Sequence, residues 1–315
     1  MVPECSMECF HRLALIIPTR NRAELLIKLL QSIRDQNIRP AQIVIVDGSD
    51  QPVREKIEEY LSSSDTYVHV FPPSLTRQRN AGIRQIRPDI TIAGFLDDDI
   101  EFENGSIEAM LDFWNATDEK TGGAEFNIIN ISPKKPLIDA IRRFFWISGT
   151  VPGKVLKSGF CTSAFPADHD HPCEWLCGGA TVWKREILQG YSFDEWYSGW
   201  AYHEDAEFSY RVVKKFNLFV VHKARLTHNP PPFNPSKNVA LGKMAVINRY
   251  HFVEKNPDLS LSVFYWSTVG EILINAMSSL KELNPDGIRI AWGNILAVFH
   301  ILRGDLIQVD ENFRK

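Results

Sequence analysis

Three adjacent aspartates, Asp97, Asp98 and Asp99, directly follow the apolar run of residues 91–96. Neighbouring carboxylates repel one another, so the cluster costs stability unless a cation or hydrogen-bond donors offset its charge. In an extended chain Asp97 and Asp99 point to the same face. Two carboxylates on one face suit a hard divalent cation such as Mg2+ or Mn2+. A solvated turn with a helix-capping role is the competing interpretation, and the aspartates alone leave both open.

A second acidic pair, Glu204 and Asp205, opens a predicted helix over residues 204–216. A positioned carboxylate of this kind can act as a general base toward a hydroxyl group. Acidic residues are also favoured in the first turn of a helix, where they cap it and complement its dipole. The residues alone favour capping. His228 precedes a proline-rich turn, where it is either a surface histidine or an imidazole ligand in a mixed metal site.

Basic, aromatic and glycine residues near these acids have two interpretations each. Arg77 and Arg79 can pair with acids along their helix or contact phosphate, a role that suits Arg79 better. Tryptophans stack on sugars in clefts but are also common core residues. Of Trp175, Trp183, Trp196 and Trp200, we select Trp200 as the candidate for such stacking because it lies just before the acidic pair. The backbone at Gly178 and Gly179 either approaches a ligand closely or forms a tight turn.

The first half of the chain alternates between strand and helix patterns. Strands are predicted at residues 13–18, 43–46, 67–70 and 91–96, and helices at 25–33, 53–61 and 74–86. Asn21 and Glu24 have the spacing of a capping box before the first helix. This alternation predicts an α/β fold with a mostly parallel, Rossmann-like sheet flanked by helices. The polar clusters follow the strands, and ligands of such sheets bind at the carboxyl ends of the strands.

The second half is less regular. We predict a strand at residues 124–131, a long loop over 132–172, and a strand pair at 218–221 and 224–227. A loop of that length is usually functional. The predicted domains are an N-terminal extension (1–12), a catalytic domain (13–255) and a helical tail (256–315). The catalytic domain divides into two halves, at about 13–132 and about 133–255.

The helical tail is apolar but does not predict a membrane span. Residues 259–280 contain Glu271 and Asn275, and residues 288–302 are interrupted by Arg289 and His300. We expect the tail to pack on the catalytic domain or to form a homodimer. Peripheral contact with a membrane is the alternative, through an apolar helical face that contains Trp266, Ile272, Leu273, Trp292, Leu296 and Phe299.

Composition limits the function classes. A net charge of -4 and a pI near 6.2 argue against a dedicated nucleic-acid-binding protein. The five cysteines are odd in number and scattered, and no apolar run precedes residue 13. We therefore expect reduced thiols and a cytoplasmic location, at the cytoplasmic face of the membrane if the tail makes contact. The tract from Asp168 to Cys173 is a weak zinc candidate, because structural zinc needs four suitably spaced ligands.

Several motifs occur in a recognisable order: LALIIPTRNR, IVIVDGS, RQRNAG, FLDDD, CGGA, YHEDAEFSYRV and then His228. Their order and spacing resemble the family 2 glycosyltransferases of the GT-A fold, over residues 13–252. Many relatives carry two acidic residues after the second strand, where this chain has Asp47 and Gly48. Asp47 is retained, so the resemblance still implies a nucleobase contact there.

The resemblance implies a role for each matching residue. It implies a general base at Asp205 with Glu204 beside it, and metal ligands at Asp99, Asp97 and His228. Asp97 is alternatively a contact of the ribose. Gly178, Gly179 and Trp200 fall on the side of the donor sugar or acceptor. The nucleotide would contact a larger set, consisting of Pro18, Thr19, Arg20, Asp47, Arg79, Asn80, Asp97 and Asp98.

The expected activity is inverting, metal-dependent transfer of a sugar from a nucleoside-diphosphate sugar to a hydroxyl acceptor. Mg2+ or Mn2+ is the expected cofactor, and the acceptor is a carbohydrate or a lipid-linked sugar. A nucleotidyltransferase that makes nucleotide sugars is one alternative, but its glycine-rich stretch after the first strand is missing from PTRNR. A catalytically inactive nucleotide-sugar-binding protein is the other, and intact Asp97, Asp99 and Asp205 disfavour it.

Overall fold

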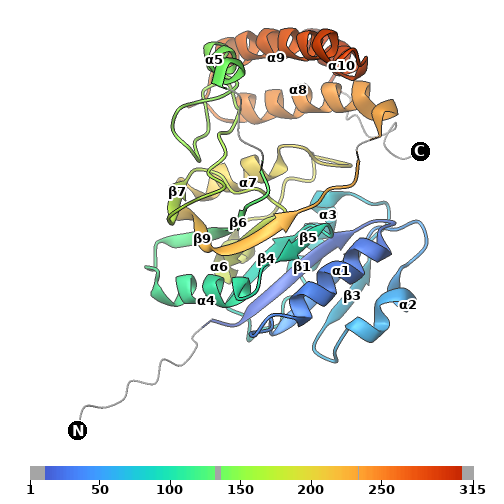
Figure 1. Cartoon of the computed structure of the whole chain (residues 1–315), viewed down its shortest axis with the longest axis vertical. Helices are drawn as coiled ribbons and strands as arrows, with labels where there is room; N and C mark the ends of the chain where they lie inside the picture. Colours follow the sequence, from blue (N-terminus) through green and yellow to red (C-terminus); the bar gives the residue numbers. More distant parts are fainter. Residues whose placement is uncertain (1–10, 132–135, 233, 307–315) are drawn as a thin grey trace.

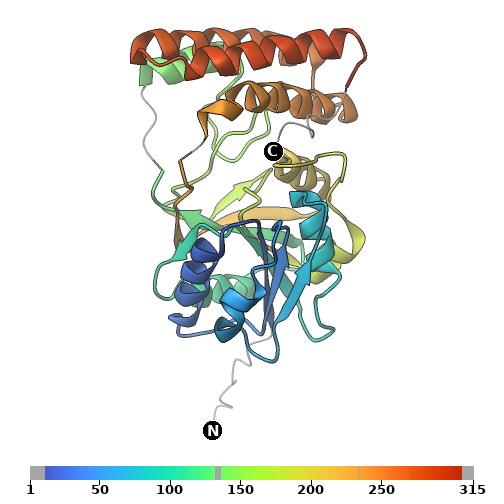
Figure 2. The ribbon, with the colours of Figure 1, turned by 90° about the vertical axis from the view of Figure 1, so that its right-hand side faces the viewer.

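The computed structural model describes residues 11–131, 136–232 and 234–306. A single twisted sheet forms the centre of the molecule, and a layer that contains the C-terminal helices lies at one end of it (Figures 1 and 2). The order of strands along the sheet is β3-β2-β1-β4-β8-β6-β9-β5, with β7 paired to β9. The predicted α/β fold is therefore confirmed. Of the predicted N-terminal extension, residues 1–10 lie outside the described residues.

The N-terminal half forms the parallel part of the sheet. Its strands are β1 (Leu13–Thr19), β2 (Gln42–Asp47), β3 (Thr66–His69) and β4 (Ile92–Leu96). Every residue of β1, β2 and β4 is buried, which explains their continuous apolar runs. The connecting helices are α1 (Ala23–Arg34), α2 (Arg54–Ile57), the 3-10 turn η1 (Glu58–Tyr60) and α3 (Leu75–Ile83).

The strand register brings the carboxyl ends of β1, β2 and β4 to one edge of the sheet. Strand β1 pairs with β2 as far as Thr19 opposite Asp47, and with β4 as far as Ile16 opposite Phe95. The chain therefore leaves β1 and β4 side by side. The three aspartates that follow β4 lie next to the residues that follow β1.

The second half contains antiparallel strands as well as helices. Its elements are β5 (Ile100–Phe102), α4 (Ser106–Ala116), β6 (Thr121–Ile128), α5 (Pro136–Phe144), β7 (His171–Cys173), β8 (Ala180–Lys184), α6 (Arg185–Gly190), α7 (Glu204–Val212) and β9 (Asn217–His228). Strand β8 runs antiparallel to both β4 and β6, whereas β6 and β9 are parallel.

Three local predictions for this part of the chain were wrong. The predicted strand pair is the single strand β9, whose pairing with β6 shifts register after Phe126 instead of turning back. Strand β6 begins at Thr121 and ends at Ile128, not at residue 131. The predicted loop over 132–172 contains α5 and β7, and its residues 132–135 lie outside the described residues.

The predicted capping box before α1 does not form. The residue at the N-cap position is Arg22, and no side chain caps the helix. Asn21 adopts a left-handed conformation with φ 55°. Its amide nitrogen donates to Asp50 Oδ2 (2.9 Å), and its Oδ1 accepts from the backbone N–H of Asp50 (3.1 Å). The side chain of Asn21, which the local spacing predicted to cap α1, therefore bonds to the loop after β2 instead.

The C-terminal helices form the end layer. They are α8 (Asn238–Lys255, preceded by the 3-10 turn η2, Pro235–Lys237), α9 (Leu261–Glu282) and α10 (Asp286–Leu302). Helices α8 and α10 approach closely at two glycines: a Cβ at Gly242 would lie 2.2 Å from the carbonyl oxygen of Ile290, and one at Gly293 would lie 2.1 Å from that of Val239. Within the described residues, no helix is long and apolar enough to cross a membrane, as predicted.

Candidate active site

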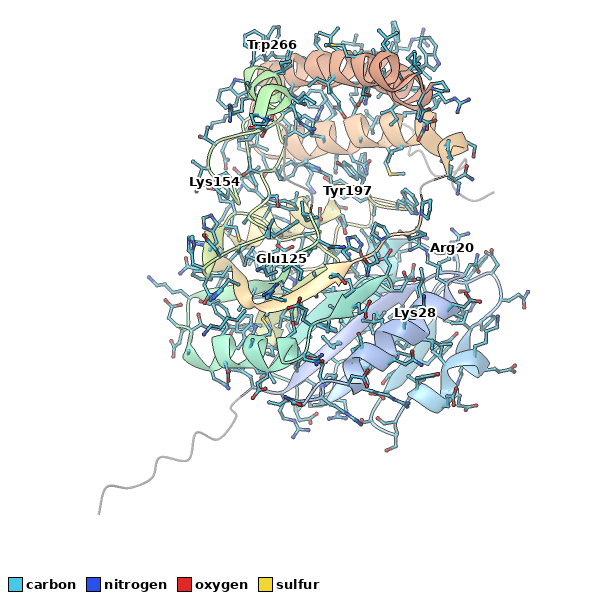
Figure 3. The ribbon with its side chains drawn as sticks, in the orientation of Figure 1. Arg20, Lys28, Glu125, Lys154, Tyr197 and Trp266 are labelled. Atoms are coloured by element: carbon cyan, nitrogen blue, oxygen red, sulfur yellow. The ribbon has the colours of Figure 1, made fainter. Side chains whose placement is uncertain are left out.

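A cleft of about 530 Å3 opens at the carboxyl edge of the parallel strands. Arg20, which Figure 3 labels, lies at this edge of the sheet, on the side that faces the helical layer. Seven of the residues predicted for the site line the cleft together: Pro18, Thr19, Arg20, Asp97, Asp98, Asp99 and Trp200.

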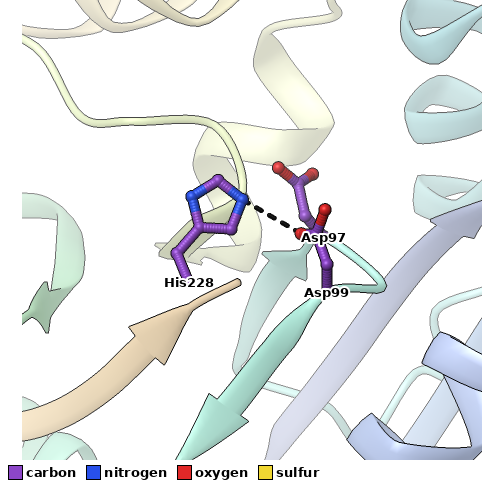
Figure 4. A group of neighbouring side chains, drawn as sticks. All are labelled: Asp97, Asp99 and His228. Carbon is purple, nitrogen blue, oxygen red and sulfur yellow. Dashed lines mark ion pairs between the residues drawn. The ribbon is translucent and has the colours of Figure 1, made fainter. Parts of the chain in front are cut away.

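Asp97, Asp99 and His228 form a compact group beside this cleft (Figure 4). Potential ligand atoms of all three lie within 4.8 Å of one another, and this is the one such group of metal-binding side chains in the part of the chain that the structure describes. His228 Nε2 lies 3.0 Å from Asp99 Oδ1. Hydrogen bonding to this carboxylate raises the pKa of His228, against the effect of its partial burial. The pairing of β9 with β5 brings about this contact, because His228 lies opposite Ile100.

The three side chains fit a divalent cation. Two carboxylates and an imidazole are suitable ligands for Mn2+ or Mg2+ when substrate oxygens or water complete the shell. Asp99 Oδ1 is buried, and among the described residues no hydrogen bond of good geometry reaches it. Its nearest partner is His228 Nε2 at 3.0 Å, and a bound cation would offset the remaining cost of its desolvation.

Asp98 turns toward α1. Its carboxylate accepts hydrogen bonds from Thr19 Oγ1 (2.7 Å) and Arg22 Nη1 (3.1 Å). Burial raises the pKa of Asp98 to about 6, and the two donors act in the opposite direction. The middle aspartate thus holds β1, β4 and the start of α1 together, while its two neighbours face the metal-binding position.

Arg79 is buried beneath the cleft and connects its two acidic motifs. Its guanidinium pairs with Glu204, and its Nη2 lies 3.7 Å from Asp97 Oδ1. Burial raises the pKa of Glu204, and Arg79 acts against that shift. Because Arg79 is only 2% exposed, a phosphate group would reach it only through the carboxylates. From this position Arg79 orients the carboxylates of Glu204 and Asp97.

The Gly178–Gly179 turn joins the aspartate cluster to Asp205. The backbone N–H of Gly178 donates to Asp205 Oδ2 (3.1 Å), and that of Asp97 donates to the carbonyl oxygen of Gly179 (2.9 Å). A Cβ at Gly179 would lie 2.1 Å from Asp97 Oδ2, and one at Gly178 would lie 2.6 Å from Arg79 Nη1. Both positions therefore require glycine, because the turn packs directly on the charged side chains.

Asp205 lies in the first turn of α7, and its carboxylate also accepts a hydrogen bond from the helix backbone. Its Oδ1 accepts from the backbone N–H of Ala206 (2.7 Å). The N-cap residue of α7 is His203 and its side chain makes no capping hydrogen bond, so the capping predicted for Glu204 and Asp205 does not form. His203, at the N-cap position, has a φ of 82°.

Besides Arg79, two predicted nucleotide contacts, Asp47 and Asn80, do not line the cleft. Asp47 is fully buried, and its carboxylate accepts from the backbone N–H groups of Ser49 and Val53 (2.8 Å each) and from Tyr67 Oη. Asn80 exchanges hydrogen bonds with the backbone of Phe193 (2.9 Å each). Both side chains are buried and hold loops in place.

Several lining residues were missed by the sequence analysis. They are Asn21, Arg22, Asp50, Pro73, Ser74, Leu75, Gln78, Gly199, Tyr202 and Lys237. Arg22, which pairs with Asp98 (3.1 Å) and Asp99 (3.4 Å), and Lys237 add positive charge to the lining of the cleft. The PTRNR motif contains Arg22 and could have suggested it, whereas Lys237 reaches the cleft only through the fold of the chain after β9.

The loop before α7 has an unusual backbone. Gly199, Ala201 and His203 all have positive φ (63°, 53° and 82°). Such conformations cost energy in residues other than glycine and occur often at functional sites. The loop is held by α8, where Asn248 Nδ2 donates to the carbonyl oxygen of Tyr202 (2.7 Å). It presents Trp200 and Tyr202, both about half exposed, to the cleft.

The zinc alternative finds no support in the described residues. His169 pairs with Asp168 (2.5 Å) and His222 with Asp170 (3.0 Å) on the surface, and no group of three ligands forms there. Cys161, Cys173 and Cys177 are free thiols, in agreement with the prediction for them.

Sequence comparison finds known relatives of the N-terminal half of the chain. Residues 14–144 match the family model described as "Glycosyl transferase family 2". A Campylobacter jejuni protein, GalNAc(5)-diNAcBac-PP-undecaprenol beta-1,3-glucosyltransferase, is 27% identical over 105 residues, which is 32% of this chain. The match spans about a third of the length of that relative, 33%.

Solved structures share the fold at low sequence identity. GalNAc-T7 with UDP, GalNAc and Mn2+ has a TM-score of 0.60 at 16% identity, over 93% of this chain and 58% of that one. The mannosyltransferase PcManGT of Pyrobaculum calidifontis, in complex with GDP-Man and Mn2+, has a TM-score of 0.53 at 14% identity, over 98% and 84%. Residues 1–349 of S. aureus TarS have a TM-score of 0.50 at 14% identity, over 96% of this chain and 91% of that one. These likenesses concern the fold.

Proposed function

We propose that the chain is a family 2 glycosyltransferase, the family whose model matches residues 14–144, and that it transfers a sugar from a nucleoside-diphosphate sugar to a hydroxyl acceptor with inversion. The observation that carries the proposal is the grouping of Asp97, Asp99 and His228 at the same edge of the sheet as Asp205. The turn at Gly178 and Gly179 connects the two. This arrangement supports a donor site and a general base that act on one substrate pair.

The donor diphosphate is proposed to bind between the aspartates and the basic lining residues. Asp97, Asp99 and His228 would hold Mg2+ or Mn2+, which when bound would offset the negative charge that develops on the departing diphosphate. Arg22 and Lys237 line the same cleft and supply further positive charge. The nucleotide would extend along Pro18, Thr19 and Arg20. The fold relatives solved with GDP-Man or UDP and Mn2+ support this choice of ligand class.

Asp205 is proposed to be the general base. As the acceptor oxygen forms its bond to the anomeric carbon, the hydroxyl proton passes to the Asp205 carboxylate. The bond between the anomeric carbon and the diphosphate oxygen breaks, and its electron pair leaves with the nucleoside diphosphate. Attack on the face opposite the leaving group inverts the anomeric centre. The N–H groups of Gly178 and Ala206, which donate to Asp205, fix the orientation of the carboxylate.

The acceptor is proposed to be a carbohydrate, in particular a lipid-linked sugar. Trp200 and Tyr202 offer half-exposed aromatic surfaces at the cleft, and such surfaces suit a sugar ring. The Campylobacter jejuni relative acts on an undecaprenol-linked saccharide, as its name states. That name supports the lipid-linked class.

Nucleotide binding tests the proposal directly. Thermal unfolding would be measured with UDP, GDP, dTDP or CMP, with and without Mn2+, for the wild type and for Asp99→Ala. A nucleotide at about 100 times its dissociation constant should stabilise the fold by roughly 2.7 kcal/mol. We expect one nucleoside diphosphate to stabilise the wild type in the presence of Mn2+ and to lose this effect in Asp99→Ala.

Asp168→Ala is the matched control, because Asp168 is an exposed aspartate in a surface ion pair with His169. It should keep the full shift. Absence of stabilisation by every nucleotide, or an equal shift in Asp99→Ala, would contradict the proposed donor site.

A further inference from the structure

Helix α9 carries an apolar stripe on its outer side. The half-exposed residues Trp266, Val269, Leu273, Met277 and Leu280 recur every three or four positions. This spacing places them on one side of the helix. At 1.5 Å per residue the 22-residue helix is about 33 Å long, so the stripe is a long feature of the surface.

Helix α10 and helix α5 extend this surface. Ile288, Trp292, Phe299 and Leu302 of α10 are at least half exposed. The ring of Phe144 at the end of α5 packs on Trp266 of α9, with centroids 5.5 Å apart. Both ribbon views show α5, α9 and α10 together as the outermost layer, beyond α8 (Figures 1 and 2). Trp266 lies at this end in Figure 3. We call the exposed apolar side chains of these three helices the outer face.

The inner side of the layer is already packed. Phe264 of α9 and Ala297 of α10 are fully buried. Between the helices Asn275 Nδ2 donates to Asn294 Oδ1 (3.1 Å), and Asn294 Nδ2 donates to the carbonyl oxygen of Gly242 on α8 (3.1 Å). These contacts fix the orientation of α9 and α10. The apolar outer face is therefore a property of the folded layer.

The outer face is large for a protein surface. If each exposed side chain leaves about 100 Å2 in water, the face amounts to on the order of 1,000 Å2. Monomeric proteins rarely expose more than a few hundred Å2 of contiguous apolar surface unless it binds something. The size of the outer face therefore indicates that it binds a partner with an apolar surface.

The charges of the layer indicate which partner. Three carboxylates of α5, α9 and α10 pair with arginines: Asp139 with Arg143, Glu271 with Arg249, and Asp286 with Arg289. Asp305, after α10, lies 3.9 Å from His300, which is charged only when protonated. Arg142 and Arg303 are exposed, and among the described residues neither is paired with a carboxylate. In and directly after these helices, Arg142 and Arg303 thus outnumber the one described carboxylate without an arginine partner, Asp305, and the charge left over is positive. Anionic phosphate headgroups complement it, whereas a second copy would bring the same arginines together.

We infer that the outer face docks on an anionic lipid surface, with the apolar side chains of α5, α9 and α10 in the headgroup region and Arg142 and Arg303 against the phosphates. This inference rests on the proposed function, because it names the surface from which a lipid-linked acceptor would be presented. Tryptophans such as Trp266 and Trp292 are characteristic of this interfacial region. Within the described residues no helix can span a bilayer, so the contact is peripheral.

Vesicle flotation of the full chain tests the inference. Vesicles of phosphatidylcholine with 40 mol% phosphatidylglycerol would be compared with pure phosphatidylcholine. We expect the wild type to float with the mixed vesicles. The double variant Leu273→Ser/Trp292→Ser should reduce this binding roughly tenfold or more, because it removes two inserted apolar groups. Arg142→Glu/Arg303→Glu should reduce binding to the mixed vesicles and have a smaller effect on pure phosphatidylcholine.

Two matched controls lie away from the outer face. Phe71→Ser changes a side chain that is 69% exposed in the loop after β3, and Lys28→Glu reverses an exposed charge on α1. Both should float like the wild type. Stabilisation by nucleoside diphosphate and Mn2+ should be equal in all these variants, which separates a failure of lipid docking from a failure of the proposed donor site.

Two outcomes would overturn the inference. One is absence of the wild-type protein from the floated fraction of both kinds of vesicle. The other is a dimer, detected by light scattering, that Leu273→Ser/Trp292→Ser dissociates while vesicle binding is unchanged. The second result would assign the outer face to a second copy of the chain.

Discussion

Two arginines are buried to the same extent in two different regions of the molecule. Arg79 in the sheet domain and Arg249 in the helical layer are each 2% exposed. Arg79 pairs with Glu204 and lies near Asp97 beneath the cleft. Arg249 pairs with Glu271 (3.0 Å), donates to Thr268 (2.9 Å) and lies 3.7 Å from the ring centre of Phe160.

The difference shows how each region uses charge. Beneath the cleft, one arginine meets several carboxylates, and the remaining negative charge faces the space where a ligand would bind. In the helical layer the buried Arg249 is paired with one carboxylate, Glu271, and the outer side is mainly apolar. The first region is arranged around a polar ligand, and the second is arranged to join helices and to present an apolar face.

Replacement of Arg79 should have the largest effect. In Arg79→Met the carboxylate of Glu204 stays buried without its partner, and breaking a buried pair typically costs about 3–5 kcal/mol. Denaturant unfolding measures the loss. The variant should also lose metal-dependent nucleotide binding, because Asp97 loses its nearby cation. Addition of Glu204→Gln should recover part of the stability; a cost below about 1 kcal/mol for the single variant would contradict the buried pair.

Replacement of Arg249 should affect stability but not the donor site. Glu271 is 17% exposed, so Arg249→Met should cost somewhat less, about 2–4 kcal/mol. At a temperature where the variant is folded, the shift caused by nucleoside diphosphate and Mn2+ should match that of the wild type. Loss of that shift in Arg249→Met would show that packing in the helical layer controls the donor site, which would contradict the separate roles of the two regions.

His203 lies between the two regions and should make stability depend on pH. Burial lowers the pKa of His203 to about 4, and Arg249 contributes to the shift. The unfolded chain, with a histidine pKa near 6.5, therefore binds more protons between pH 6.5 and 4. Stability should fall as the pH drops through this window, by up to about 3 kcal/mol. Unfolding of the wild type and His203→Gln at pH 7.5 and 5 measures this, and equal slopes for both would refute it.

Substitutions on the outer face should have the smallest effect on stability. Met277 is 58% exposed on α9, and Met277→Ser should change the free energy of unfolding by less than about 0.5 kcal/mol. A buried residue of the same helix is the contrast: Phe264→Ala should cost about 3–5 kcal/mol. A large cost for Met277→Ser would mean that the outer face packs on the protein itself.

The sequence predicted the parts of the fold that depend on local patterns. The apolar runs of β1, β2 and β4 were found because all their residues are buried. The capping box failed because the side chain of Asn21 bonds to Asp50, which is 29 residues away. Strand β9 was divided in two because its irregularity lies in the pairing with β6, which the sequence of one strand does not contain.

The candidate site was predictable to the extent that its residues follow strands. The aspartates after β4 and the PTR motif after β1 meet because parallel strands end at one edge. Lys237 and Tyr202 could not be found in this way, because loops from the second half bring them to the cleft. The burial of Arg79 was also unpredictable, since its partner Glu204 lies 125 residues away.

The central claim is that Asp205 takes the proton of the acceptor. The most direct test is Asp205→Asn, with release of nucleoside diphosphate from the donor sugar and thermal stabilisation by that nucleotide with Mn2+ measured on the same preparation. Asp258→Asn, at a half-exposed surface aspartate, is the control. We predict a rate reduced by about 10²–10⁴-fold with unchanged nucleotide stabilisation. A rate equal to that of the wild type would remove Asp205 from the mechanism.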